Sequence, residues 1–140
     1  MADSSTSTSS VLSVASSALR AQQARMRVIA ENIANADSTA KTPGADPYRR
    51  QMPVFEPVGV DGGAQGVKLA RVTPDSTEFK LEYAPGHPAA DKNGYIKLPN
   101  VDPLIEALDM REAQRAYQAN LNVIEAARAM QSHILDLLKK

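Results

Sequence analysis

The only two histidines in this chain of 140 residues are candidate metal ligands or proton-transfer groups. His87 lies four residues before Asp91, a spacing that would place both side chains on one face of a helix, but Gly86 and Pro88 predict a loop. His133 lies in a distant segment, and the chain has no cysteine to complete a zinc site. We therefore expect His87 to hydrogen-bond to backbone groups in a turn, instead of binding a metal or transferring a proton.

Two further segments contain residue types that bind anions. Residues 61–66, Asp-Gly-Gly-Ala-Gln-Gly, are glycine-rich like a phosphate-binding loop. They lack the Lys-Ser/Thr ending of such a loop and precede a strand-like run instead of a helix, so we expect a turn. Arg49 and Arg50 follow Tyr48 and could hold a carboxylate or phosphate through their guanidinium groups. In a chain without net charge, a salt bridge between subunits or a solvated surface pair is the favoured interpretation.

The amides of Asn32 and Asn35 are the last candidates for contact with a ligand. Both lie where an apolar helical pattern ends. Asparagine side chains compete for backbone groups at helix ends, so capping is the favoured interpretation. The sequence contains no detectable nucleophile with an adjacent general base. We therefore predict no catalytic residue, no metal site and no cofactor, and we expect a structural protein instead of an enzyme.

The composition also restricts the classes of partner. Sixteen basic residues balance sixteen acidic ones, and aromatic residues make up only 4% of the chain. A neutral chain lacks the basic surface that binds nucleic acid, and small apolar side chains suit close helix packing better than a deep substrate pocket. No apolar run reaches the roughly 20 residues that span a bilayer.

The first ten residues are polar and rich in serine and threonine. This composition predicts a disordered segment over residues 1–10. The segment also lacks the basic and apolar regions of a cleaved signal peptide, so we expect any export to use another route.

Apolar residues recur at alternating spacings of three and four at both ends of the chain, a pattern typical of helices in coiled coils. The N-terminal pattern predicts a helix from about Val11 to Ala36. The C-terminal pattern predicts a helix from Pro103 to Leu138, with Asp102 as its N-cap. The positions of this pattern form one stripe along each predicted helix, called here the first stripe. On the N-terminal helix they are Leu12, Ala15, Leu19, Gln22, Met26, Ile29 and Ile33, and on the C-terminal helix they are Met110, Ala113, Tyr117, Asn120, Ile124, Ala127, Gln131, Ile134 and Leu138.

A second stripe runs beside the first on each predicted helix. It consists of Val11, Val14, Ala18, Ala21, Arg25 and Val28, and of Ala116, Ala119, Val123, Ala126, Met130, His133 and Leu137. Two stripes are wider than one helix–helix contact buries, and exposed apolar surfaces of this kind usually mark a protein interface. The alternative is a compact monomer whose central segment folds over the second stripe.

The middle of the chain, from Lys41 to Pro99, contains every glycine and all but one of the prolines, which excludes helix over most of it. Alternation from Phe79 to Tyr83 predicts a half-buried strand, and Asn93-Gly94 predicts a tight turn before another extended run. We predict an α+β fold, mainly α, in which residues 11–40 and 100–140 form a discontinuous helical assembly domain. Residues 41–99 form a small β-rich, partly irregular insert.

Several blocks of sequence resemble a known family. Asn32-Ile33-Ala34-Asn35, which closes the first helix, resembles the signature of flagellar axial proteins of the rod and hook. Three blocks resemble the FlgC family of proximal rod proteins in particular: Pro47-Tyr48-Arg49-Arg50-Gln51, Pro85-Gly86-His87-Pro88-Ala89-Ala90-Asp91-Lys92-Asn93-Gly94-Tyr95 and Leu98-Pro99-Asn100-Val101-Asp102. The segment from Asp109 to Asn120, with Arg115 and Ala116, is similar to the C-terminal helix of that family. The resemblance extends from about Val11 to the end and departs at Ala84, where the family pattern has an acidic residue.

The resemblance implies a structural subunit of the bacterial flagellar basal body. It further implies a place in the rod that crosses the periplasm, and export by the flagellar type III apparatus without a cleaved signal peptide. The terminal helices would form the inner layer of a helical tube, and the partners would be copies of the chain, other rod proteins, and ring and export-gate components. Another rod or hook-junction subunit is the first alternative, and a helical export chaperone or adaptor is the second.

Overall fold

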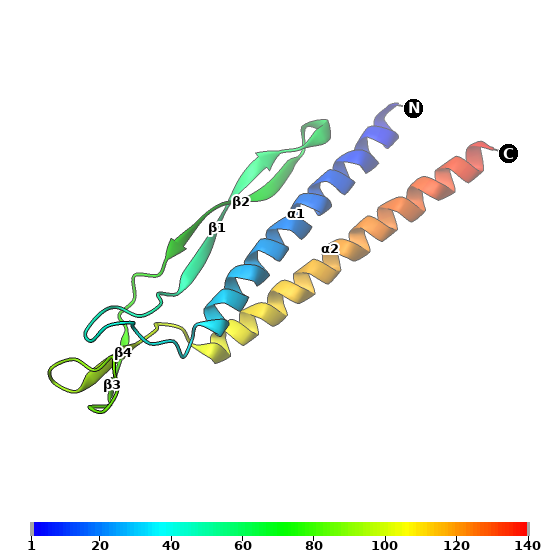
Figure 1. Ribbon diagram of the computed structural model, residues 1–140. Coiled ribbons are helices and arrows are strands. Elements are labelled where there is room, and N and C mark those ends of the chain that lie inside the picture. Colours follow the sequence, from blue (N-terminus) through cyan, green and yellow to red (C-terminus); the bar gives the residue numbers. More distant parts are fainter. Residues whose placement is uncertain (1, 140) are drawn as a thin grey trace. The chain divides into compact units, whose positions relative to one another are not determined.

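The computed structural model describes residues 2–139 and has two long helices with four short strands between them in sequence (Figure 1). Helix α1 spans Ala2–Ala34 and helix α2 spans Pro103–Leu138. The central segment carries β1 (Gln51–Gly59), a short 3-10 turn (Asp61–Gly63), β2 (Gln65–Pro74), β3 (Lys80–Tyr83) and β4 (Tyr95–Leu98). This arrangement confirms the predicted α+β fold with long terminal helices. Within residues 2–139, no helix combines the length and apolar character that a membrane crossing requires.

The predicted boundaries of α2 are confirmed at both ends. The Oδ1 atom of Asp102 accepts hydrogen bonds from the backbone N–H groups of Leu104 at 3.0 Å and Ile105 at 3.5 Å. Asp102 is therefore the N-cap, and Pro103 occupies the first helical position, where its missing N–H group costs no hydrogen bond.

Helix α1 begins earlier than expected. Residues 2–10 are helical, which differs from the disorder predicted for residues 1–10, while Met1 lies outside the described residues. Serine and threonine are only moderately unfavourable in helices, and extending an existing helix avoids the cost of nucleation. At the other end the helix stops at Ala34, where the Asn35 amide donates to the carbonyl of Glu31 at 2.8 Å. The capping role predicted for Asn35 is confirmed.

The four strands form two separate two-stranded sheets, β1 with β2 and β3 with β4. In the antiparallel second sheet, Lys80 lies opposite Leu98 and Tyr83 lies opposite Tyr95. The expectation that β3 is half-buried is wrong, since all four of its residues are exposed. Its Tyr83 ring instead packs edge-on against Tyr95, with ring centroids 5.2 Å apart. The alternation predicted the strand correctly but carried no information on whether another layer covers it.

The chain divides into two compact units, and each contains parts of both helices and of the central segment. Unit 1 comprises Met1–Arg25, Val54–Arg71 and Glu112–Lys140, and unit 2 comprises Met26–Pro53 and Val72–Arg111. This division differs from the predicted one, which separated the helices from the insert. In each unit, part of the insert packs with part of the helices. The insert and the helices are therefore not two separate compact units.

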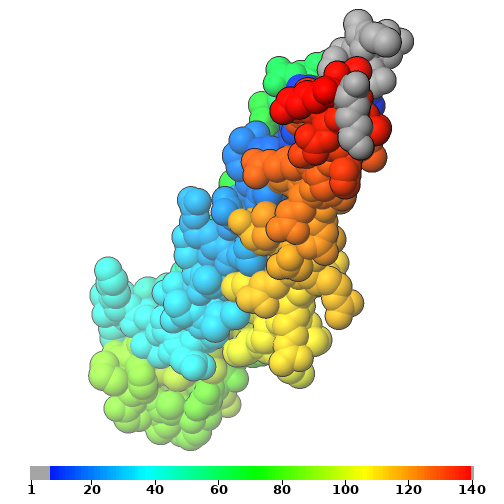
Figure 2. Space-filling view, turned by 90° about the vertical axis from the view of Figure 1, so that its right-hand side faces the viewer, coloured from blue at the N-terminus to red at the C-terminus, as the bar shows by residue number. Residues whose placement is uncertain are grey.

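Small side chains make the helix contact in unit 1. Ala15 of α1 is buried, as are Ala113 and Ala127 of α2. The corresponding parts of the two helices lie side by side in both views of the molecule (Figures 1 and 2). Alanine lets two helix backbones approach closely, so the first stripe forms the intramolecular contact that the heptad spacing predicts.

The β1–β2 hairpin packs on α1 in unit 1 through Ser17. The buried Ser17 hydroxyl accepts a hydrogen bond from the Val67 backbone N–H at 3.1 Å and donates to the carbonyl of Val14 at 2.7 Å. Gly66 lies against the same hydroxyl, because a Cβ atom placed there would be 2.5 Å from Ser17 Oγ and 2.8 Å from Val60 Cγ1.

Substitution Gly66→Ala should therefore separate the hairpin from α1. Overpacking of this kind costs about 1–3 kcal/mol, which corresponds to a roughly 5- to 150-fold faster exchange of the Val67 amide proton if local opening limits exchange. Amide hydrogen exchange measures this effect directly. Gly59→Ala is the matched control, since a Cβ atom at Gly59 has no neighbour within 4 Å. Equal protection of Val67 in both variants would contradict the assigned packing.

Candidate assembly surfaces and the polar cluster that orients them

A buried asparagine joins three segments of unit 2. Asn32, near the end of α1, is 1% exposed. Its Oδ1 atom accepts hydrogen bonds from the backbone N–H of Gln51 at 2.8 Å and from the Tyr48 hydroxyl at 2.9 Å. Its Nδ2 atom donates to the Gln51 carbonyl at 2.8 Å and to Glu106 Oε2 at 3.2 Å. All four hydrogen-bonding positions of this amide are thus used within the chain. The capping role predicted for Asn32 is wrong, because the side chain points into the unit.

The second buried group of this cluster is the carboxylate of Glu106 in the first turn of α2. It is 0% exposed. Its Oε1 atom accepts a short hydrogen bond from Arg50 Nε, and Oε2 accepts from Asn32. Arg50 also contacts Asp75 Oδ2 at 3.3 Å and Asp109 Oδ2 at 3.8 Å. A buried carboxylate needs charged and hydrogen-bonding partners, and Arg50 and Asn32 supply both.

Asn100 fixes the strand ends around this cluster. Its Oδ1 atom accepts from the Arg50 backbone N–H at 2.8 Å, and its Nδ2 atom donates to the carbonyl and the hydroxyl of Thr77 at 3.1 and 2.8 Å. Arg49 donates to the carbonyls of Asp75 and Thr77, both at 2.9 Å, and its guanidinium lies 4.1 Å from the centre of the Phe79 ring. The interpretation of Arg49 and Arg50 as an intersubunit or solvated surface pair is therefore wrong: both bind within unit 2.

The cluster shifts the pKa of several of its groups. Burial raises the pKa of the Tyr48 hydroxyl, and the nearby charges of Glu31 and Glu106 add to this effect. The pKa of Asp75 is lowered, first by the hydrogen bond from the Thr77 backbone N–H, then by the Thr77 side chain and by Arg50. Burial works to lower the pKa of Arg50, but the hydrogen bond and charge of Glu106, together with Asp75, raise it overall. The ionised forms of Asp75 and Arg50 are thus the stable ones at neutral pH.

The inward direction of Glu106 forces its apolar neighbours outward. Leu104, Ile105 and Leu108 are 70%, 52% and 58% exposed. These three residues, called here the α2-start patch, lie on the first two turns of α2, next to a small pocket of about 220 Å³. Large aliphatic side chains that are exposed together on one helix are typical of a surface that binds another protein.

The second stripe differs between the two helices. On α1, Ala21 and Val28 are buried, Val14, Ala18 and Arg25 are half-buried, and Val11 is exposed. For this helix, except at Val11, the second stripe is thus covered within the chain, as the compact-monomer alternative predicts. On α2, the stripe is exposed from Ala119 onward, as expected for an interface. The exposed positions are Ala119, Val123, Ala126, Met130, His133 and Leu137.

The end of α2 is exposed on every side. From Arg128 to Lys139 each described residue is exposed, including Ile134 and Leu138 of the first stripe. The large apolar residues of this segment, called here the α2-end surface, are Met130, Ile134, Leu135, Leu137 and Leu138. Arg128, Ser132, Asp136 and Lys139 form a polar face of this segment, and the exposed apolar side chains on its other sides require a partner that covers them.

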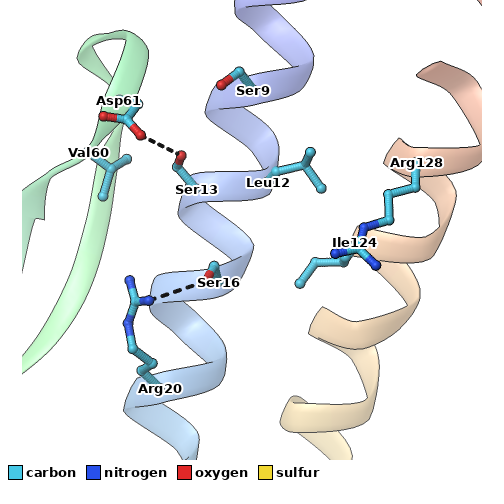
Figure 3. Close-up of a pocket in the computed structure, with 9 residues that line it drawn as sticks. All are labelled: Ser9, Leu12, Ser13, Ser16, Arg20, Val60, Asp61, Ile124 and Arg128. Atoms are coloured by element: carbon cyan, nitrogen blue, oxygen red, sulfur yellow. Dashed lines mark hydrogen bonds between the residues drawn. The ribbon is translucent and has the colours of Figure 1, made fainter.

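A cleft of about 520 Å³ lies between the helices of unit 1 (Figure 3). Leu12 of α1 and Ile124 of α2 point toward each other across it, and Ser13 donates to Asp61 Oδ2 at 3.3 Å on the hairpin side. Arg20 and Arg128 lie at its margins and point in different directions. Their guanidinium groups do not converge on a common ligand, so the cleft has the character of loose helix packing.

The other predicted site residues are distributed over both units. Leu12, Leu19, Met26, Met110, Tyr117 and Ile124 are half-buried, Ile29 is buried and Ile33 is exposed. His87 Nδ1 accepts from the Ala89 backbone N–H at 3.0 Å, as expected for a turn. Gly94 takes a positive φ of 84° in the loop between β3 and β4, and Asp91 Oδ1 accepts from the N–H groups of Asn93 and Tyr95 at 2.8 and 3.0 Å. Pro99 is buried, and the Asn120 amide donates to the Ala116 carbonyl at 2.8 Å.

Sequence reasoning missed Glu106 and Asp75, the partners of Arg50. The signal for Glu106 was present: a single carboxylate stands among Leu104, Ile105, Ala107 and Leu108 at the start of a helix. A hydrophobic pattern predicts that the aliphatic side of a helix is buried. Here Glu106 is buried, and Leu104, Ile105 and Leu108 are exposed. Asp75 has no comparable signal, since it lies in a loop between prolines and polar residues.

Known proteins match both ends of the chain and most of its length. A family model described as "Flagella basal body rod protein" matches residues 12–40, and one described as "Flagellar basal body rod FlgEFG protein C-terminal" matches residues 92–137. The flagellar basal-body rod protein FlgC of Agrobacterium fabrum is 50% identical over 90% of this chain and 91% of its own length. FlgC of Salmonella typhimurium is 43% identical over 91% of this chain and 95% of its own length. FlgC of Bacillus subtilis is 36% identical over 91% of this chain and 96% of its own length.

The chain belongs to the FlgC family of flagellar basal-body rod proteins. This membership confirms the family predicted from the Asn32–Asn35, Pro47–Gln51 and Pro85–Tyr95 blocks. The FlgC relatives are named as rod proteins, which agrees with the expectation of a structural subunit instead of an enzyme. The structure adds that Asn32 of the axial-protein signature meets Tyr48 and Arg50 of a FlgC block in one polar cluster.

Substitution Asn32→Ala should strongly destabilise unit 2. It removes four hydrogen bonds and leaves the Gln51 backbone and the Glu106 carboxylate with fewer partners, at a cost of about 3–5 kcal/mol. Urea unfolding followed by circular dichroism measures the change. Asn35→Ala is the control, because it removes one hydrogen bond at an exposed helix end and should cost about 1 kcal/mol. Equal effects would contradict a central role for Asn32.

The lowered pKa of Asp75 predicts an acid dependence of stability. The folded pKa lies below the ordinary value of 3.8, so the unfolded chain binds the proton first. The resulting stabilisation is present above pH 3.8 and is lost as the pH falls through the lowered pKa. Urea unfolding from pH 7 down to pH 2 should therefore show a smaller loss of stability below pH 3.8 for Asp75→Asn than for the parent chain. An unchanged acid dependence would contradict this assignment.

Proposed function

We propose that this chain is a structural subunit of the proximal rod of the bacterial flagellar basal body, and that it assembles through α1 and α2 into a helical tube. The observation that carries the proposal is the exposed apolar stripe on α2, from Ala119 to Leu137, in a chain whose relatives are named rod proteins. Within the chain the helix pair covers the first stripe of α2 only as far as Ala127, and the exposed second stripe of α2 needs a neighbouring subunit. A contact between different faces of two subunits does not close, and it propagates a tube.

The proposal includes the place and route of the protein. The subunit crosses the periplasm as part of the rod, after export by the flagellar type III apparatus without a cleaved signal peptide. Its partners are copies of itself, other rod proteins, and components of the basal-body rings and export gate.

Electron microscopy of basal bodies from cells that lack the gene tests the function. Membrane rings without a rod, with rods restored by a plasmid copy, are the expected result. Complete rods in the deletion strain would refute an obligatory rod subunit. A helical export chaperone is the second candidate; it would stay in the cytoplasm and be absent from purified basal bodies, as measured by immunoblotting.

Substitution Ile124→Asp should abolish rod assembly and motility. Ile124 is half-buried opposite Leu12 (Figure 3), so a carboxylate there removes the apolar contact across the cleft and brings a charge between the helices, and pairing with Arg128 one turn farther along α2 does not restore that contact. Swimming in soft agar and electron microscopy of basal bodies are the readouts. Asn122→Asp is the matched control, because it adds the same charge at an exposed position and can still accept the hydrogen bond from Gln118. Normal motility of Ile124→Asp would exclude the assigned helix contact.

A further inference from the structure

The loop between β3 and β4 contains the one asparagine of the chain that a glycine follows. Asn93 is exposed, and Gly94 has a positive φ of 84°. Every other asparagine precedes a residue whose side chain hinders approach to its backbone nitrogen. Glycine has no side chain, so its backbone nitrogen is open to a neighbouring group. Asn93 is therefore the most labile amide side chain of the sequence.

The reaction of such a pair is deamidation, in which a backbone nitrogen attacks the preceding side chain. The nitrogen of Gly94 loses its proton and forms a bond to Cγ of Asn93. The bond from Cγ to Nδ2 breaks, and Nδ2 leaves with that proton as ammonia. The cyclic imide then adds water and opens to aspartate or isoaspartate. No oxidant or reductant is needed, and each event adds one negative charge to the loop.

The folded loop holds the attacking nitrogen in a hydrogen bond. The N–H of Gly94 donates to the carbonyl of Asp91 at 3.0 Å, which closes a β-turn from Asp91 to Gly94. The carbonyl of Gly94 accepts from the N–H of Ala84 at 2.9 Å. The glycine is thus held on both sides, and attack on Asn93 requires local opening of the turn.

The side chain of Asp91 fixes the backbone around the same pair. Its Oδ1 atom accepts hydrogen bonds from the N–H groups of Asn93 at 2.8 Å and of Tyr95 at 3.0 Å. Aspartate at the first position of a turn commonly binds the backbone in this way. One carboxylate oxygen therefore holds the residues before and after Gly94, and it opposes the rearrangement that imide formation needs.

The structure also requires the glycine that makes Asn93 labile. A Cβ atom at Gly94 would lie 2.9 Å from Cε2 of Tyr83 and 3.1 Å from Cβ of Pro85. The positive φ is strained for residues with a side chain. Because the loop cannot avoid the labile pair by changing residue 94, protection has to come from the hydrogen bonds of the turn.

We propose that Asn93 is a deamidation site whose reaction the folded loop suppresses, and that Asp91 is the residue that protects it. The inference goes beyond assembly, since it concerns the chemical lifetime of the folded chain. Loss of protection has a structural consequence. Isoaspartate adds one atom to the backbone beside Gly94, which disturbs the register that pairs Tyr95 with Tyr83.

Mass spectrometry of the full-length chain tests the site. The chain is kept at neutral pH, either folded or in guanidinium chloride. Trypsin then cleaves after Lys92 and Lys97 and releases residues 93–97, in which the deamidated fraction is measured against incubation time. We expect deamidation to be about tenfold slower, or slower still, in the folded chain, because attack must wait for the hydrogen bonds of the turn to open.

Variants assign the protection to Asp91. Asp91→Ala removes both side-chain hydrogen bonds and should deamidate about tenfold faster than the folded parent chain. Asp91→Asn keeps an acceptor oxygen and should be as slow as the parent chain, and its new asparagine lies outside residues 93–97. Asp46→Ala is the matched control, because it removes a carboxylate of the same unit that accepts from Lys97 at 2.8 Å and leaves the turn intact.

Equal rates in the folded and the denatured parent chain, or no deamidation in the denatured chain, would refute the site. An unchanged rate in Asp91→Ala, a fast rate in Asp91→Asn or equal acceleration in Asp46→Ala would refute the role of Asp91. Circular dichroism verifies that the helices of each variant are intact. If those of Asp91→Ala are not, Asp91→Glu takes its place, because its longer side chain moves the carboxylate away from the turn and should likewise accelerate the reaction.

Discussion

Burial of the Glu106 carboxylate is the constraint on which unit 2 depends. An ionised group without solvent contact must have charged and hydrogen-bonding partners, and each partner here has its own structural consequence. Arg50 brings the start of β1 and the loop with Asp75 to α2. Asn32 connects the same carboxylate to the end of α1, and it satisfies both backbone groups of Gln51 as a neighbouring strand would. One carboxylate thus determines how two helices and the insert meet.

The role of this cluster is orientation more than stability. Replacing a buried ion pair by well-packed apolar residues is often neutral for stability, whereas removing one partner is costly. A fully satisfied polar cluster accepts one arrangement of its members, because each alternative leaves a donor or acceptor unpaired. The direction of the first turns of α2, with aliphatic side chains outward, follows from this requirement. In unit 1 the contacts are of another kind, with buried alanines between the helices and one serine that holds the hairpin.

Much of the secondary structure was predictable from sequence, because it depends on local chemistry. The N-cap Asp102 followed by Pro103 determined the start of α2, and the prolines and glycines confined the strands to residues 41–99. The failures have physical causes. Asn32 and Arg50 were assigned to capping and to the surface because their partners lie far away in sequence, at Gln51, Glu106 and Asp75. The exposure of β3 and the helix over residues 2–10 depend on packing and helix propagation, which hydrophobic periodicity does not report.

The alanines at the helix contact of unit 1 have a thermodynamic consequence. Alanine has no side-chain rotamers, so Ala15, Ala113 and Ala127 lose no rotational freedom when the helices meet, whereas a leucine or methionine contact would lose roughly 0.5–2 kcal/mol of such freedom per residue. The same small side chains bury little apolar area and so contribute little attraction. The attraction at this contact therefore comes mainly from the larger half-buried side chains of Leu12, Leu19, Tyr117 and Ile124, while the alanines determine how closely the two helix backbones approach.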